Sequence, residues 1–271
     1  MRTAFQLARR PACFQPWRKR RCLGALARLL AMLLPTSAVA LVGPAIEAPE
    51  LDRFVVMVLN RSGGSASFCS ASVIAQNVVL TAAHCVTTPA DTRVHFRDAQ
   101  GQKILLDVAS IAINPGYRPD AIRRRLVSID LALVRLAEPL PSNFTPIDSF
   151  YSGPVDVGQM FRIAGYGIAD EANHKTGGVL RAGNVVASGP KSAILLWARD
   201  PNNRGLGACT GDSGAPIFTA KQPVLVAVAV WAQGENGNLC GALTQAVLIA
   251  PQRRWIEDIL RLWSMTGNDR R

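Results

Sequence analysis

The stretch Cys209-Thr210-Gly211-Asp212-Ser213-Gly214-Ala215-Pro216 carries the strongest chemical signal in this chain of 271 residues. It places Ser213 between two glycines, which allow the backbone to turn sharply and to approach a substrate closely. The same arrangement places the N–H groups of Gly211 and Ser213 where they can stabilise a developing oxyanion. The stretch therefore makes Ser213 the first candidate for a catalytic nucleophile.

Two other segments contain a histidine and an aspartate in suggestive positions. His84 lies in Thr81-Ala82-Ala83-His84-Cys85, and Asp130 lies in Ile129-Asp130-Leu131-Ala132-Leu133-Val134. Taken alone, a histidine beside a cysteine at a strand end is more often structural, and Asp130 could simply cap a turn. An aspartate entering an apolar strand must be hydrogen-bonded or charge-paired, because an isolated buried carboxylate is costly. The joint presence of the three segments is what points to catalysis.

From residue 41 onward, short apolar runs alternate with turns rich in Gly, Pro, Asn, Asp and Ser. This texture favours an all-β sandwich or barrel over alternating strands and helices. The expected strands are Phe54–Leu59, Ser72–Leu80, Lys103–Ile113, Leu131–Leu136, Met160–Ala164, Val179–Ala187, Ala193–Ala198, Val224–Trp231 and Ala246–Ile249. One helix is predicted at the C-terminus, where Pro251 can start it and Trp255, Ile259 and Leu262 recur at helical spacing.

The formal charge of +11 is mainly a property of the first 40 residues. These hold eight of the 30 basic side chains and no acidic one, which leaves 22 basic and 19 acidic side chains in the rest. The body therefore has no obvious electrostatic footprint for nucleic acid.

Residues 1–40 are typical of an export signal. A basic stretch ends in Arg18-Lys19-Arg20-Arg21, a mainly apolar run covers Leu23 to Leu34, and Ala38-Val39-Ala40 offers small residues for signal peptidase. The apolar run is too short to span a bilayer comfortably, although an uncleaved signal anchor is the alternative. We expect a signal peptide over 1–40, a single exported domain over 41–271, and a secreted or periplasmic location.

Four of the six cysteines remain after the signal is removed, which suggests two disulfides in an exported body. Four cysteines allow three connectivities, and the residues alone do not choose between them. The remaining cysteines and His84 lack the paired close spacing of zinc sites, so we expect no metal.

The three segments resemble the signature segments of the trypsin/chymotrypsin family of serine proteases, in the family's order of His, Asp and Ser. The separations also fit, with 46 residues from His84 to Asp130 and 83 from Asp130 to Ser213. The resemblance implies an all-β fold of two six-stranded antiparallel barrels with a C-terminal helix and the active site between the barrels. It further implies that Ser213 attacks the scissile carbonyl, that His84 transfers the proton, and that Asp130 orients His84, with no cofactor.

The family resemblance also implies the disulfides Cys69–Cys85 and Cys209–Cys240. Cleavage after Ala40 begins the mature chain with Leu41-Val42-Gly43-Pro44, which is similar to the start of activated family members. In the family that α-ammonium pairs with the aspartate before the nucleophile, here Asp212. We therefore expect signal cleavage itself to activate the enzyme.

The specificity pocket is predicted from the same resemblance. Arg- and Lys-specific members have an aspartate six residues before the nucleophile, where this chain has Gly207 followed by Ala208. The pocket wall matches Val230-Trp231-Ala232, and Thr244 is expected on the opposite wall. Since Ala232 and Thr244 narrow the pocket, we expect a small or medium apolar side chain before the scissile bond.

Two alternatives to an endopeptidase remain: a catalytically silent homologue that acts as a binding module, and an esterase that uses the same triad. We expect a polypeptide substrate and protein inhibitors as partners, and a monomer in solution. We expect neither nucleic-acid binding nor a stable membrane anchor after signal cleavage.

Overall fold

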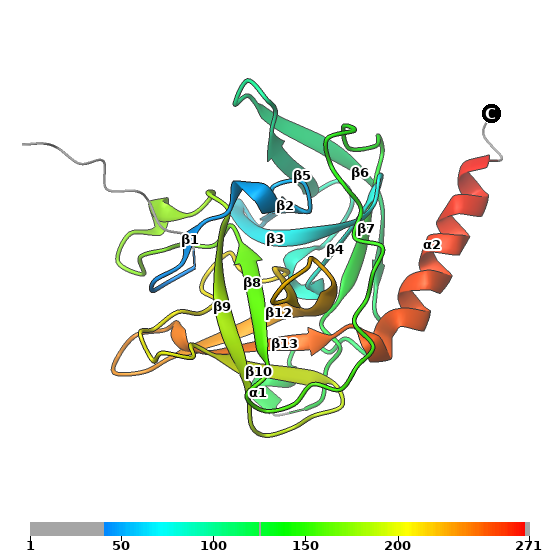
Figure 1. Ribbon diagram of the computed structural model, residues 1–271. Coiled ribbons are helices and arrows are strands. Elements are labelled where there is room, and N and C mark those ends of the chain that lie inside the picture. The colour runs from blue at the N-terminus through cyan, green and yellow to red at the C-terminus, as the bar shows by residue number, and fades with distance from the viewer. Residues whose placement is uncertain (1–40, 125, 269–271) are drawn as a thin grey trace, which may run out of the picture. The chain divides into compact units, whose positions relative to one another are not determined.

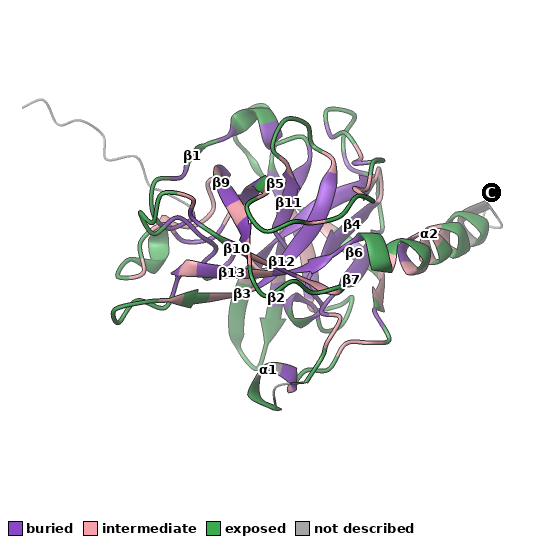
Figure 2. Cartoon of the chain, turned by 60° about the horizontal axis from the view of Figure 1, so that its bottom comes forward, coloured by how far each residue is buried: buried purple, intermediate pink, exposed green. Residues whose placement is uncertain are grey.

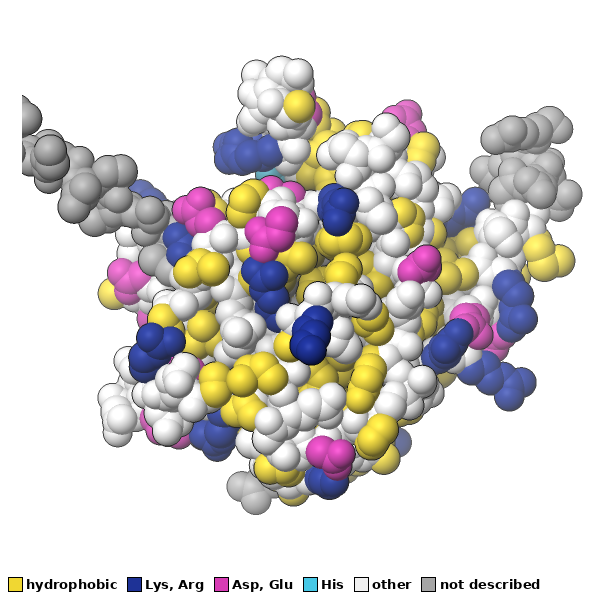
Figure 3. Space-filling view, viewed as in Figure 1, with side chains coloured by type: hydrophobic (Ala, Val, Ile, Leu, Met, Phe, Trp, Pro, Cys, Tyr) yellow, Lys and Arg dark blue, Asp and Glu magenta, His cyan; other side chains and the backbone are white. Residues whose placement is uncertain are grey.

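The computed structural model describes residues 41–124 and 126–268 (Figure 1). The expected signal peptide over 1–40 lies outside the described residues. Within the described part, no helix is long and apolar enough to cross a membrane. On the face seen in Figure 3, Lys and Arg side chains are scattered among acidic and apolar ones and form no continuous basic patch.

The first barrel is closed by six antiparallel strands in the order β2-β3-β4-β7-β6-β5. The hairpin between the first two strands turns through Gly63 and Gly64, whose φ angles are both positive (55° and 84°). Such two-residue turns match the twist of the strands they join. The bounds are β2 (Val55–Ser62), β3 (Ser65–Ala75), β4 (Val78–Thr81), β5 (Thr92–Arg97), β6 (Lys103–Ile113) and β7 (Ala132–Leu136).

The second barrel is closed by six further strands in the order β8-β9-β10-β13-β12-β11, and the short strand β1 pairs with β9. The bounds are β1 (Ile46–Glu47), β8 (Met160–Gly165), β9 (Arg181–Ser188), β10 (Leu195–Arg199), β11 (Pro216–Thr219), β12 (Leu225–Gly234) and β13 (Gly241–Leu248). The two barrels and the terminal helix confirm the predicted fold class.

Most of the buried residues are apolar and belong to the core clusters. The ribbon of buried residues is purple in Figure 2 and lies mainly along the strands. Central strands such as β4 and β11 are buried almost throughout, so they form continuous apolar runs. Strand β5 instead alternates buried and more exposed residues, with Arg93 and His95 facing outward. This admixture of charged residues explains why β5 was missing from the predicted strands.

One predicted strand, Ser72–Leu80, was wrong in its bounds. Its residues belong to β3 and β4, which form a hairpin through a two-residue turn at Gln76 and Asn77. Apolar residues flank this turn on both sides, so the pattern of hydrophobic residues did not reveal the reversal of the chain. Strands β1 and β11 were also not predicted; they contain only two and four residues, respectively.

Two α-helices, α1 (Ala121–Arg124) and α2 (Arg253–Asn268), and four 3-10 helices complete the described part. Figure 1 shows α2 beside β7. Ile256 is its fully buried residue, while Leu262 is 54% exposed rather than part of the packed face. The 3-10 helices are η1 (Pro49–Leu51), η2 (Ala83–Cys85), η3 (His174–Thr176) and η4 (Ala250–Gln252).

Candidate active site

The two barrels contribute different parts of the site. In the first barrel, Thr81 of β4 is paired with Ala132 of β7. His84 follows β4 within η2, and Asp130 precedes β7, so this antiparallel pairing brings both residues to the same end of the barrel. Residues 46 positions apart thus become neighbours.

Asp130 holds His84 through two hydrogen bonds. The Nδ1 atom of His84 lies 2.6 Å from Oδ2 of Asp130, and the backbone N–H of His84 donates to Oδ1 at 3.0 Å. The carboxylate is buried, whereas the imidazole is exposed on its other side. When Nδ1–H donates to the carboxylate, Nε2 keeps its lone pair and can accept a proton.

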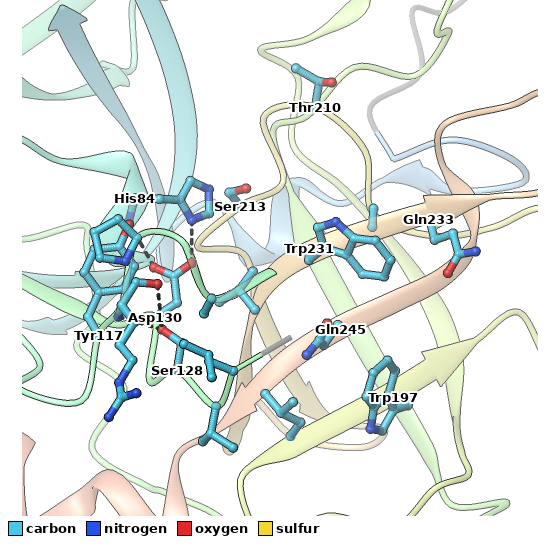
Figure 4. A pocket seen from close by; sticks show the side chains of 18 of the residues that line it. His84, Tyr117, Ser128, Asp130, Trp197, Thr210, Ser213, Trp231, Gln233 and Gln245 are labelled. Carbon is cyan, nitrogen blue, oxygen red and sulfur yellow. Dashed lines mark hydrogen bonds and ion pairs between the residues drawn. The ribbon is translucent and has the colours of Figure 1, made fainter. Parts of the chain in front are cut away.

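Ser213 comes from the second barrel, on the loop that leads into β11. Figure 4 shows its side chain beside the imidazole of His84. Ser213, His84 and Asp130 all line one cavity of about 1000 Å³. The structure therefore brings the three sequence-predicted residues together at one cleft.

The nucleophile loop leaves three backbone N–H groups without an acceptor among the described residues, those of Thr210, Gly211 and Ser213. Within residues 209–215, backbone N–H groups donate to other protein groups at Cys209, Asp212, Gly214 and Ala215. The N–H groups of Gly211 and Ser213 are free to bind an anionic oxygen next to the Ser213 hydroxyl, as an oxyanion hole requires.

Ser70, a residue that the sequence did not single out, connects the two barrels at this loop. Its N–H donates to the carbonyl oxygen of Ser213 at 2.8 Å, and its hydroxyl donates to that of Gly211 at 3.0 Å. The hydroxyl also accepts the N–H of Tyr166 at 2.9 Å. No pattern in the sequence distinguishes Ser70, because its partners come from the other barrel.

Gly214 is required by this contact between the barrels. Its φ is +83°, and a Cβ at this position would lie 2.0 Å from the carbonyl oxygen of Ser70 and 2.2 Å from Oγ1 of Thr81. The Thr81 hydroxyl itself donates to the Ser70 carbonyl at 2.8 Å. The absence of a side chain at Gly214 thus allows the two barrels to approach at the nucleophile.

Asp212 is fully buried beneath the nucleophile loop. Its carboxylate accepts the N–H groups of Gly167 at 2.8 Å and Cys209 at 2.9 Å. Burial raises its pKa to about 7, although these two N–H donors oppose the rise. Asp212 forms no ion pair within the described residues.

Leu41 is completely buried and packs in the hydrophobic cluster that includes Ala215. The next residue, Val42, accepts a hydrogen bond from the N–H of Gly207 at 3.4 Å. The chain start expected from the sequence therefore lies inside the second barrel's core. Its pairing with Asp212 stays a prediction.

The loop that receives this segment is held by Asp200. Its buried carboxylate accepts the N–H groups of Asn202, Arg204 and Leu206 at 2.6–3.2 Å. Burial acts to raise the pKa of Asp200, but these donors more than offset it and leave the pKa below its ordinary value. The carboxylate thus fixes the backbone of the loop immediately before Gly207.

Only half of the six predicted pocket residues line the cavity. Val230, Trp231 and Ala232 do so, whereas the other three are buried behind the wall: Gly207, Ala208 and Thr244. The Thr244 hydroxyl accepts the N–H of Ala208 at 2.9 Å, and Thr244 pairs with Ala232 across β12 and β13. Thr244 is buried and does not line the cavity, and its expected role in narrowing the pocket stays a prediction.

The cavity also contains residues that the sequence did not indicate. Trp197 and Leu195 contribute from β10, Gln245 from β13, and Leu239 from the loop before β13 (Figure 4). Their strands were predicted, at least in part, but a strand pattern does not show which side chains face a cleft on another strand.

Both disulfides that the resemblance implied are present, Cys69–Cys85 and Cys209–Cys240. Two groups of residues have ligand atoms close enough for a metal, namely Cys69, His84 and Cys85, and Glu171, Cys209 and Cys240. Their cysteine sulfurs form these disulfides and so are not the thiolates that metals bind.

Comparison with known proteins places these observations in context. A family model described as Trypsin matches residues 43–256. Transmembrane protease serine 9 of Rattus norvegicus is 28% identical over 195 residues, covering 63% of this chain and 18% of the relative. Trypsin beta of Drosophila erecta is 26% identical over 257 residues, covering 83% of this chain and 96% of the relative. The structure of a scabies mite inactivated protease paralogue has a TM-score of 0.63 at 21% identity and covers 81% of this chain and 99% of that chain. The chain thus spans less than a fifth of the first relative and nearly all of the second.

Replacement of Gly214 by alanine is expected to destabilise the protein far more than the same change at Gly158. Both glycines have a positive φ, +83° and +90°, but a Cβ at Gly158 meets nothing within 4 Å. Gly158→Ala should therefore cost only about 1–2 kcal/mol of backbone strain, whereas Gly214→Ala adds a clash with the Ser70 carbonyl. Urea unfolding of the two variants measures the difference, and equal losses of stability would contradict the barrel contact.

Proposed function

The chain belongs to the trypsin family of serine proteases, and we propose that it is a secreted endopeptidase that cleaves peptide bonds through Ser213, His84 and Asp130. The observation that carries this proposal is the arrangement of His84. One imidazole nitrogen is bound to Asp130, and the ring lies beside the Ser213 hydroxyl (Figure 4).

The proposed reaction starts when the Ser213 hydroxyl attacks the carbonyl carbon of the peptide bond. His84 takes the hydroxyl proton at Nε2 and then gives it to the leaving amine, which yields an acyl-enzyme. A water molecule, deprotonated by His84, attacks the acyl group and releases the acid. Asp130 keeps the imidazole in the required tautomer and stabilises its cationic form through the 2.6 Å hydrogen bond.

The unused N–H groups of Gly211 and Ser213 stabilise the oxyanion of each tetrahedral intermediate. The loop that carries them is held from three sides: by Ser70, by the Asp212 carboxylate below it, and by the Cys209–Cys240 disulfide. Because these donors are fixed before the substrate binds, the reaction does not have to reorganise them.

A catalytically silent homologue is the second candidate, and one structural relative with the same fold is described as inactivated. The intact Ser, His and Asp set argues for activity. An esterase with the same triad is the third candidate; it would cleave ester substrates while leaving peptide anilides intact.

Export is the remaining part of the proposal. The basic and apolar composition of residues 1–40 supports a cleaved signal peptide and a secreted or periplasmic enzyme. We propose a monomer that acts on polypeptides and is open to protein inhibitors, with residues 41–271 as its peptidase domain.

A fluorophosphonate probe should label residues 41–271 at Ser213. Ser213→Ala should abolish labelling and peptide hydrolysis, and His84→Ala should do nearly the same, because the triad acts as a unit. Asp130→Asn should lower kcat by about 10⁴-fold with the fold intact. Ser128→Ala removes another hydroxyl of the same cavity and serves as the matched control, which should still be labelled. Absence of labelling in the folded wild-type protein would favour the silent homologue.

Cleavage should favour a small apolar residue before the scissile bond. Because we propose that Ala232 and Thr244 narrow the pocket, peptide p-nitroanilides ending in Ala or Val should have kcat/KM at least about tenfold above those ending in Arg or Phe. Thr244→Gly should improve the Phe substrate, whereas Thr244→Ser keeps the hydroxyl that binds the Ala208 N–H and should change specificity less. A wild-type preference for Arg would contradict this assignment.

A free amino group at Leu41 should be required for full activity. Residues 41–271 should be active, and the same chain with one additional N-terminal alanine should be at least about 100-fold less active, because Asp212 then stays buried without a cation. Asp212→Asn should resemble the extended chain.

The processed chain and the chain with the added alanine should also differ in how their free energy of unfolding depends on pH. With its pKa raised to about 7, Asp212 keeps a proton in the folded extended chain that the unfolded chain releases near pH 4. The free energy of unfolding of the extended chain should therefore fall as pH rises from about 4 to 7. The α-ammonium of Leu41 should remove this decline in the processed chain. Equal activity and equal pH profiles would eliminate the activation mechanism and leave the triad proposal intact.

A further inference from the structure

Glu171 binds the rim of the cleft from a loop that the proposed mechanism does not use. Its Oε2 atom accepts the N–H of Leu239 at 2.7 Å, and its Oε1 atom accepts the N–H of Cys240 at 2.8 Å. Both carboxylate oxygens thus accept hydrogen bonds from consecutive backbone amides, and the negative charge strengthens these bonds.

The rim segment itself has few other attachments. Residues 235–239 are all exposed, and Asn236 and Gly237 have positive φ angles (57° and 90°). Within the described residues, the segment is otherwise held by a turn from Asn238 to Glu235 and by an exposed ion pair between Glu235 and Arg199. Exposed ion pairs contribute little to stability, so Glu171 holds the rim to the body together with the Cys209–Cys240 disulfide, which anchors the residue after Leu239.

The loop that carries Glu171 is joined to the nucleophile loop. The N–H of Ile168 donates to the carbonyl of Thr210 at 2.8 Å, and the N–H of Gly167 donates to Asp212. The Thr176 hydroxyl accepts the N–H of Ala169, which closes the loop on itself. Glu171 therefore sets the position of the rim relative to Ser213.

Leu239 is the rim residue that this arrangement presents to the cleft. Its side chain lines the cavity with Ser213 and Trp231, yet 77% of the residue is exposed. A leucine left in water on a cleft wall gains hydrophobic contact when an apolar group covers it. An apolar side chain of a bound peptide can provide this contact.

We propose that Glu171 is a positioning residue that holds Leu239 over the cleft, and that Leu239 contacts an apolar residue of the bound peptide. This inference rests on the proposed protease function and adds a substrate contact to it. Glu171 touches no reacting atom; it acts on substrate binding through the backbone of Leu239 and Cys240.

The test is a double-mutant cycle of Glu171→Gln and Leu239→Ala in residues 41–271. Glutamine has the same shape but offers one acceptor oxygen, and its NH₂ group faces the second backbone N–H. Each single variant should raise KM for an apolar tetrapeptide p-nitroanilide about 3- to 10-fold, with kcat per fluorophosphonate-titrated site unchanged within about twofold. The double variant should bind no worse than Leu239→Ala, because both changes remove the same contact. Glu257→Gln, a glutamate of α2 remote from the cavity, is the control and should leave KM unchanged.

Hydrogen exchange supplies a readout independent of catalysis. The amides of Leu239 and Cys240 should exchange slowly in the wild type and at least tenfold faster in Glu171→Gln. If Glu171→Gln does not fold, Leu239→Ala alone must still raise KM. An unchanged KM in Leu239→Ala, additive effects in the double variant, or a proportional loss of kcat in Glu171→Gln would each overturn the inference. An unlabelled wild type would instead overturn the protease proposal.

Discussion

Three hydrogen bonds of Ser70 join the first barrel to the second, two of them to the nucleophile loop, and the geometry of the site depends on them. They connect Ser70 with Ser213, Gly211 and Tyr166. Each bond contributes only about 1 kcal/mol to stability, but all three lie in a buried place where an unmet donor or acceptor is costly. The relative position of the barrels is therefore determined at the point where the hydroxyl of Ser213 must meet the imidazole of His84.

The nucleophile loop combines a buried charge with the absence of side chains. A Cβ at Gly165 or Gly167 would lie 2.2–2.3 Å from the Asp212 carboxylate. A Cβ at Gly214 would lie 2.0 Å from the Ser70 carbonyl oxygen. This packing excludes water from Asp212 and raises its pKa. A carboxylate buried in this way gains stability from a nearby cation, and its pairing with an amino group at Leu41 stays a prediction.

In the proposed enzyme, several side chains shape the substrate-binding region by accepting hydrogen bonds from backbone N–H groups. Thr244 accepts the N–H of Ala208, Asp200 accepts the N–H of Leu206 just before Gly207, and Glu171 accepts the N–H of Leu239 at the rim. All three place a side-chain oxygen on backbone N–H groups of an irregular loop. Such loops lack the regular hydrogen bonds of strands, so these side chains supply the acceptors that the loop N–H groups do not find in the backbone.

The sequence by itself determined the class of the fold, and it identified the three residues that we propose carry the chemistry. The serine segment, the histidine segment and the aspartate strand are local patterns whose glycines and apolar runs reflect constraints within a few residues. The number of strands in each barrel came only through the family resemblance. Only the tertiary structure revealed the contacts of Ser70 and Glu171, the place of Trp197 on the cavity wall, and the burial of Thr244 outside that wall. These roles depend on contacts between distant residues, such as Ser70 and Gly211, which are 141 positions apart. A local pattern has no means to specify such contacts, because they arise only when the barrels close.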